Sequence, residues 1–83
     1  MVGINFGGFM GFYAYCESLG VGLLREDKVF IKSCLRRIDK SDHKIVLSRY
    51  VELWVQMLGE LGDAVQAQNV GRRTANAWLR DYR

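Results

Sequence analysis

The segment KIVLSRYVELWVQMLGE, residues 44–60, decides the fold that we predict for this chain. Drawn as a helix, it has only a narrow polar strip, formed by Ser48, Arg49, Glu52 and Gln56. A helix that is apolar around most of its circumference must be buried around most of it. We therefore expect an all-α protein, a compact bundle of three to four helices around a largely buried helix over residues 43–60.

The stretch before this segment predicts an amphipathic helix over residues 26–39. Its apolar side chains share one face: Phe30, Ile31, Cys34, Leu35 and Ile38. A basic stripe runs along the opposite face, at Lys28, Lys32 and Arg36. Such a stripe is either a solvated face or a surface that binds phosphate or acidic groups.

The first 24 residues are apolar and rich in glycine and aromatic residues, and Glu17 is their only charge. We expect a short helix over residues 9–19 that ends at Gly20 and Gly22. Its buried side would hold Phe9, Phe12, Tyr13, Cys16 and Leu19. The segment lacks the basic start of a signal peptide, and its apolar run is too short to favour a transmembrane helix.

We therefore expect a cytoplasmic protein. A separate hypothesis is that aromatic side chains of this segment anchor the chain on a membrane or in a partner's groove. The candidate anchors are Phe6, Phe9, Phe12 and Tyr13.

Length limits the chain to one small domain, because it has 83 residues. Within it, residues 1–24 form the apolar N-terminal segment and residues 25–83 the helical body. This size excludes an enzyme with a cleft between two lobes. A domain this small buries a modest share of its surface, and the apolar circumference of residues 43–60 exceeds what three partner helices cover easily. We expect a homodimer for this reason.

Residues with catalytic or metal-binding chemistry are few. Cys16, Cys34 and His43 stand singly, without the spacing of a metal site. We interpret both cysteines as small hydrophobes in a reducing compartment, with a disulfide between them as the alternative, and His43 as a surface or capping residue. Phosphate-binding loops and nucleophile elbows are absent, and the adjacent Glu26 and Asp27 are typical of a helix's first turn. We expect no enzymatic activity, metal or cofactor.

The C-terminal segment DAVQAQNVGRRTANAWLRDYR, residues 63–83, carries the one motif. It resembles the helix-turn-helix unit of DNA-binding proteins, with residues 63–68 as the supporting helix, 69–71 as the turn and 72–82 as the recognition helix. The resemblance implies that Arg72 and Arg73 contact guanine or phosphate, that Asn76 contacts adenine, and that Thr74 contacts a phosphate or a thymine methyl. Gln68 departs from the pattern, since an apolar residue is usual there.

The alternative is one unbroken helix over residues 63–82. Its small and aromatic residues would then form a continuous stripe against the helix over residues 43–60. That stripe comprises Ala64, Ala67, Gly71, Ala75, Trp78 and Tyr82.

Basic charge is concentrated in two segments. Residues 25–44 carry seven Lys and Arg against four Asp and Glu, and residues 64–83 carry four against one. We expect a small nucleic-acid-binding regulator that contacts DNA through Arg72, Arg73, Thr74, Asn76 and Arg80, with Lys28, Lys32 and Arg36 as secondary phosphate contacts. The alternative is an inhibitor or adaptor, similar in style to small phage-encoded proteins, that docks the same basic faces on an acidic protein.

Overall fold

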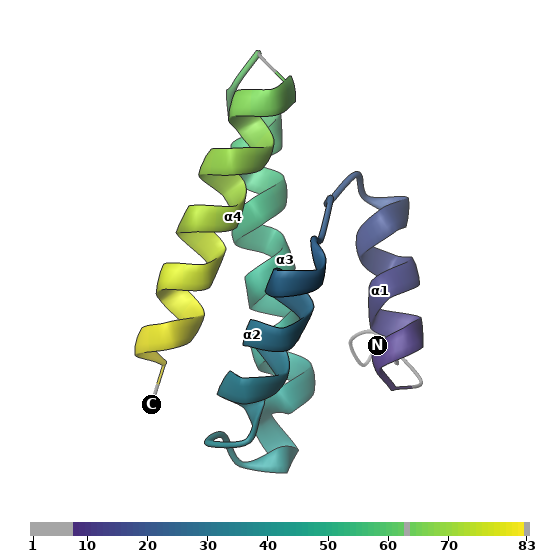
Figure 1. The fold of residues 1–83 in the computed structure, drawn as a ribbon, viewed down its shortest axis with the longest axis vertical. Coiled ribbons are helices and arrows are strands. Elements are labelled where there is room, and N and C mark those ends of the chain that lie inside the picture. Colours follow the sequence, from purple (N-terminus) through teal and green to yellow (C-terminus); the bar gives the residue numbers. More distant parts are fainter. Residues whose placement is uncertain (1–7, 63, 83) are drawn as a thin grey trace.

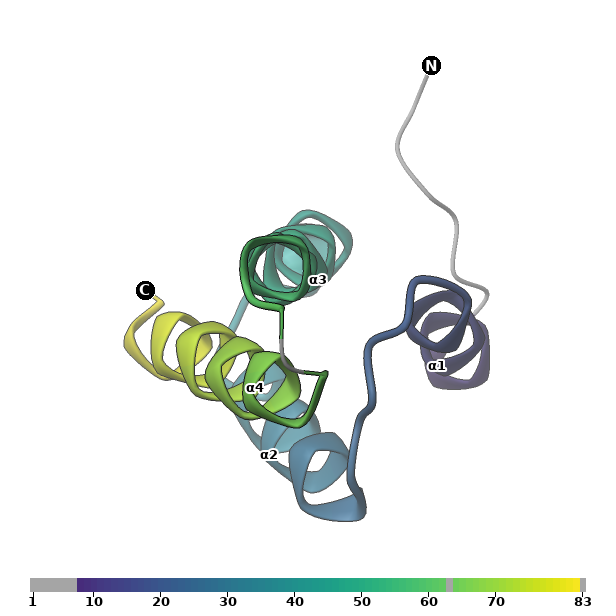
Figure 2. The ribbon, with the colours of Figure 1, turned by 90° about the horizontal axis from the view of Figure 1, so that it is seen from above.

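The computed structural model describes residues 8–62 and 64–82, and these residues form an all-α bundle. Its helices are α1 (Phe9–Ser18), α2 (Arg25–Leu35), the short 3₁₀ helix η1 (Lys40–Asp42), α3 (His43–Glu60) and α4 (Ala64–Asp81). The predicted fold class is confirmed. Figures 1 and 2 show α1 and α4 on opposite sides of the molecule, with α2 and α3 between them.

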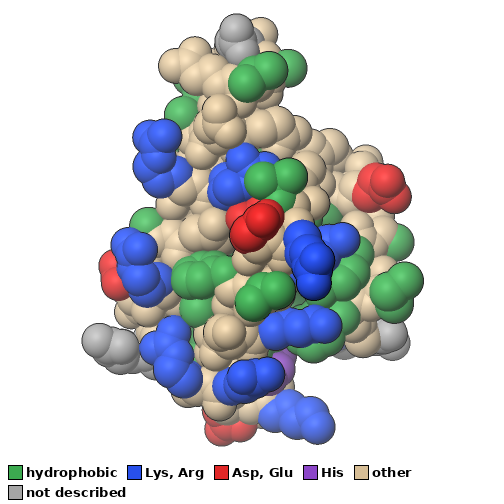
Figure 3. All heavy atoms as spheres, in the orientation of Figure 1, with side chains coloured by type: hydrophobic (Ala, Val, Ile, Leu, Met, Phe, Trp, Pro, Cys, Tyr) green, Lys and Arg blue, Asp and Glu red, His purple; other side chains and the backbone are tan. Residues whose placement is uncertain are grey.

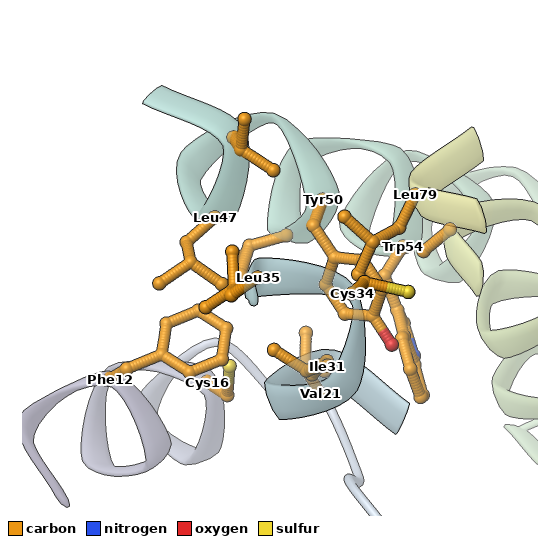
Figure 4. Packing of buried hydrophobic residues seen from close by; sticks show 13 residues of the cluster. Phe12, Cys16, Val21, Ile31, Cys34, Leu35, Leu47, Tyr50, Trp54 and Leu79 are labelled. Carbon is orange, nitrogen blue, oxygen red and sulfur yellow. The ribbon is translucent and has the colours of Figure 1, made fainter. Parts of the chain in front are cut away.

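Helix α3 supplies the largest share of the core, namely Val46, Leu47, Tyr50, Val51 and Trp54. Side chains of the other helices and of the α1–α2 linker converge on this row (Figure 4). The helix is buried along one side, while Ile45 on its other side is 69% exposed. The helix therefore contributes to the core through one face and is less buried than its apolar circumference predicted.

Helix α1 begins at the predicted Phe9 and ends at Ser18, one residue before the predicted end. Gly20 follows it with φ of 81°, a left-handed conformation that favours glycine and stops the helix. Phe12 and Cys16 bring the helix into the core, so Phe12 is not free to act as a surface anchor. Leu19 is 40% exposed, so its predicted burial is wrong. Cys34 is also buried, and both cysteines are free thiols, so the interpretation as small hydrophobes is confirmed and the disulfide is absent.

Helix α2 ends at Leu35, four residues before the predicted end. The Nε2 atom of His43 donates to the carbonyl oxygens of Leu35 and Ile38, at 2.9 Å each. These contacts satisfy carbonyls that a longer helix would have paired internally. The expected capping role of His43 is confirmed, and it explains why the chain turns here.

Helix α4 is continuous from Ala64 to Asp81. The predicted turn at residues 69–71 is wrong, and the unbroken helix is confirmed within the described residues. Asp63, the first residue of the predicted C-terminal segment, lies outside those residues, as does Phe6 of the N-terminal hypothesis.

The residues that α4 buries are Ala67, Gly71, Ala75 and Leu79. The predicted stripe is right at its three central small residues and wrong at its ends. Ala64 is exposed, and Leu79 takes the buried position in place of Trp78 and Tyr82, which are half-buried. Small residues on this face let α4 approach α3 closely, because they present little side-chain bulk.

Candidate interaction face

A buried carboxylate joins α2 to α4. Asp27 is 3% exposed and lies in the first turn of α2. Its Oδ2 accepts from the backbone N–H of Leu24 at 2.9 Å and from Nε of Arg72 at 2.8 Å, and its Oδ1 accepts from Nδ2 of Asn76 at 3.1 Å. A buried charge is tolerated when it is paired and hydrogen-bonded in this way. Asp27 therefore holds Arg72 and Asn76, two of the α4 side chains that the helix-turn-helix resemblance assigns to base recognition.

Arg72 is engaged on every nitrogen of its guanidinium. Besides the Asp27 contact, its Nη2 donates to the carbonyl of Gly22 at 2.9 Å and its Nη1 to Oδ1 of Asn69 at 3.1 Å. The guanidinium also lies 5.1 Å from the ring centroid of Trp54, a cation–π geometry. Its side chain retains 21% exposure. Arg72 thus joins the α1–α2 linker, α2 and α3 to α4.

Asn76 has both ends of its amide occupied. Its Nδ2 donates to Asp27, and its Oδ1 accepts from the hydroxyl of Tyr50. Burial raises the pKa of Tyr50, and the negative charge of Asp27 raises it further, so the hydroxyl keeps its proton and remains a donor. Reading an adenine would require Asn76 to give up two intramolecular hydrogen bonds.

Gln68, the departure from the helix-turn-helix pattern, has a structural role. Its Oε1 accepts from Nε1 of Trp54 at 2.9 Å and from the backbone N–H of Gly22 at 3.1 Å, while its Nε2 donates to the carbonyl of Gly20 at 2.7 Å. A leucine there would leave these groups without those partners. These hydrogen bonds explain why residue 68 is a glutamine and not the apolar residue that is usual in the helix-turn-helix pattern.

Two of the predicted α4 residues remain exposed, Arg73 and Arg80. They line an open hollow on the outer face of α4 together with Asn69, Arg72, Asn76 and Ala77. Asp81 lies 3.8 Å from Nε of Arg80, and this exposed pair leaves the arginine free to exchange partners. Thr74 is half-buried and is not among the lining residues.

Lys28 and Lys32, two of the predicted basic residues, contact aromatic rings of α1. The ammonium of Lys28 lies 4.6 Å from the ring centroid of Tyr13, and that of Lys32 lies 5.0 Å from the centroid of Phe9. Burial raises the pKa of Tyr13. Arg36 is exposed. The aromatic contacts order two of these cations without removing them from the surface.

Val29 is a surface residue that the sequence analysis missed. It is 58% exposed and lines a shallow hollow on α2 with Arg25, Glu26, Phe30 and Ser33. Figure 3 shows Lys and Arg side chains around hydrophobic ones on the face that α2 and α4 present. The sequence spacing could have identified it. Val29 lies four residues after Arg25 and three before Lys32, so the three side chains share one side of a helix.

We use "basic face" for this surface and define it by its exposed or half-exposed members. They are Arg25, Lys28, Val29 and Lys32 on α2, Arg36 at the C-terminal cap of α2, and Arg73, Ala77 and Arg80 on α4.

Metal-binding groups of three or more His, Cys, Asp or Glu are absent from residues 8–62 and 64–82. Within the same residues, every helix is too short or too polar to cross a membrane. Comparisons with protein-family models, curated proteins and solved structures found no match.

Proposed function

We propose that the chain is a non-enzymatic binding protein that docks its basic face on an acidic protein, as an inhibitor or adaptor of the kind that phages encode. One observation favours docking on an acidic protein over DNA binding, the two functions expected from the sequence. Two of the side chains suited to reading bases, Arg72 and Asn76, are hydrogen-bonded within the bundle, while Arg73 stays exposed. The exposed cations Arg73 and Arg80 are left to contact acidic side chains or phosphates without these two neighbours.

The composition of the face favours a protein over a nucleic acid. Protein interfaces combine an apolar centre with a polar rim, and arginine is common in them. Val29, 58% exposed between Arg25 and Lys32, has this arrangement. Phosphate contacts, which dominate affinity for DNA, would use the cations of this face and not its apolar residue. The free thiols of Cys16 and Cys34 are consistent with the reducing cytoplasm that we propose as the compartment.

Binding to DNA is the second candidate, supported by the hollow that Arg73 and Arg80 share on α4. In this case the contacts would be to phosphates, and the affinity would fall steeply as salt rises. A homodimer would bring two such hollows to one duplex. The oligomeric state stays a prediction that sedimentation equilibrium can test.

A photo-crosslinking experiment tests the proposal. A photoreactive amino acid at position 77, in the α4 hollow, is used in nuclease-treated lysate, and the captured protein is then purified and titrated with the wild-type chain. We expect an acidic partner whose binding is lost in Arg73→Glu/Arg80→Glu and kept in Arg49→Glu, which changes an exposed arginine of α3.

Random-sequence duplex DNA is titrated in parallel at two salt concentrations. Tight, salt-sensitive binding to DNA that disappears in Arg73→Glu/Arg80→Glu, with no acidic protein captured, would replace the proposal by the second candidate.

A further inference from the structure

The outer side of α2 carries a regular pattern of cations around an apolar residue. Arg25, Val29 and Lys32 on α2 and Arg36 at its C-terminal cap are separated by four, three and four residues, and all four are exposed. Residues with this spacing form one stripe along a helix. Glu26 and Ser33 border the stripe and carry no positive charge. The stripe is thus a row of positive charges with one apolar contact point.

The outer side of α4 repeats part of this pattern. Arg73, Ala77 and Arg80 are separated by four and three residues, so a small apolar residue again lies between two cations. Seven residues of a helix span about 10.5 Å, which is the approximate axial separation of Arg73 from Arg80 and of Arg25 from Lys32. Both helices therefore offer cations at the same interval.

The two stripes have a common rigid support. Helices α2 and α4 pack against each other, and the Arg72–Asp27 ion pair at 2.8 Å joins them beneath the surface. Asn76 adds a second hydrogen bond to the same carboxylate. These contacts hold the two helices that carry the cations in place before a partner binds, which lowers the entropic cost of binding.

We infer that the basic face receives an acidic amphipathic α-helix of its protein partner, with carboxylates seven residues apart and an apolar side chain between them. This inference rests on the proposed function. A helix in the partner has the same rise per residue as α2 and α4, so its carboxylates at i and i+7 match the cation interval of about 10.5 Å. An apolar side chain at i+4 would then contact Val29 and exclude water from the flanking ion pairs.

Glu26 adds a selective element. It is exposed in the first turn of α2, beside Arg25 and on the edge of the Val29 hollow. A partner helix with a continuous acidic face would place a carboxylate near Glu26 and lose affinity by repulsion. The preferred partner therefore carries its carboxylates at intervals and not in an unbroken run.

Two synthetic peptides test the inference with the full chain. The first is a helical peptide with Glu at every seventh position and Leu at i+4 of each repeat, on an alanine-rich background. The second has the same composition, with its Glu and Leu positions permuted so that the seven-residue spacing is lost, and circular dichroism confirms that both are helical. Binding is measured by fluorescence anisotropy at moderate salt, with duplex DNA as a third ligand.

We expect the patterned peptide to bind at least about tenfold more tightly than the permuted one. Val29→Asp and Arg73→Glu/Arg80→Glu should each weaken its binding by about tenfold or more, because the first replaces the apolar contact by a carboxylate that repels the peptide and the second reverses the charge of two cations. Arg49→Glu, on the exposed side of α3, should change it by less than about twofold. Circular dichroism of each variant checks that the fold is kept.

The outcomes separate this inference from the proposal on which it rests. Equal affinity for the two peptides, lost in Arg73→Glu/Arg80→Glu, would overturn the helix-matching inference and leave an acidic protein as the partner. Failure of both peptides to bind would overturn the inference, whereas the proposed function is overturned only if the crosslinking experiment also captures no acidic protein. An unchanged affinity in Val29→Asp would also overturn the inference, since the apolar contact is part of it.

Discussion

The side chain of Asp27 gives its neighbours Arg72 and Asn76 a structural role. Its carboxylate accepts from Arg72, Asn76 and the backbone of Leu24 in a position that is 3% exposed. Because a buried carboxylate needs these donors, Arg72 and Asn76 are held in the bundle. The same two residue types on a helix surface would be available to a ligand.

The substitution Asp27→Asn should destabilise the protein by about 2–4 kcal/mol, since it leaves Arg72 uncompensated and places an amide N–H₂ among donors. Urea unfolding followed by circular dichroism measures the change. Asp81→Asn is the matched control, because the side chain of Asp81 is 79% exposed and its ion pair to Arg80 is 3.8 Å long. It should change stability by less than about 0.5 kcal/mol.

A double-mutant cycle gives the decisive form of this test. In the Asp27→Asn background, Arg72→Met should cost much less than it does in the wild type, because the charge that it removes is no longer paired. Equal costs in the two backgrounds would contradict the view that these residues act as one unit.

At the scale of elements, the contact between α3 and α4 depends on one glycine. A Cβ atom at Gly71 would lie 2.7 Å from Cδ1 of Trp54 and 3.1 Å from Cγ and Nε1 of the same ring. Trp54 is fully buried, and its Nε1 donates to Gln68, so the indole has little room to move. The glycine that suggested a turn in the sequence instead permits two helices to meet.

Gly71→Ala should therefore destabilise the protein by about 1–3 kcal/mol, because overpacking against Trp54 outweighs the gain in helix propensity. Gly59→Ala in α3 is the matched control. Its added methyl group would meet nothing within 4 Å, so this change should stabilise by up to about 1 kcal/mol. Thermal unfolding compares the two, and a stabilising Gly71→Ala would contradict the close packing.

Considering the whole molecule, the core and its edge contain thiol and phenol groups whose buried surroundings favour the uncharged form. Burial raises the pKa of the Cys16 thiol to about 12 and also raises the pKa values of Tyr13 and Tyr50. In the unfolded chain these groups ionise near pH 9 for the thiol and pH 10 for the phenols. Above those values the unfolded state releases protons that the folded state retains.

Stability should therefore be full below about pH 9 and fall progressively as the pH rises toward 12. Urea midpoints at pH 7.5 and pH 10.5 measure the effect, and Cys16→Ala should reduce the difference between them because it removes the thiol contribution. Equal midpoints for the wild type at the two pH values would contradict the assignment.

The helical class, the stop of α1 before Gly20, the buried cysteines and the surface or capping role of His43 could all be predicted, because they follow from local periodicity, backbone conformation and side-chain chemistry. The cations Lys28, Lys32 and Arg36 could be placed on one side of their segment, since charge spacing along a helix is a local property, but the exposed Val29 among them was missed. Local pattern could not decide whether residues 69–71 form a turn, because asparagine and glycine fit a turn as well as a close helix contact.

Which polar residues of α4 remain available to a partner depends on contacts between helices that local sequence does not reveal. Arg72, Asn76 and Gln68 are held by groups that lie 14 to 50 positions away in the chain, among them Asp27, Tyr50, Trp54 and the carbonyl of Gly22. Hydrogen bonds over such separations depend on how the helices pack. The packing of α2 and α3 on α4 is therefore what leaves Arg73 and Arg80 at the surface while their neighbours hold the bundle together.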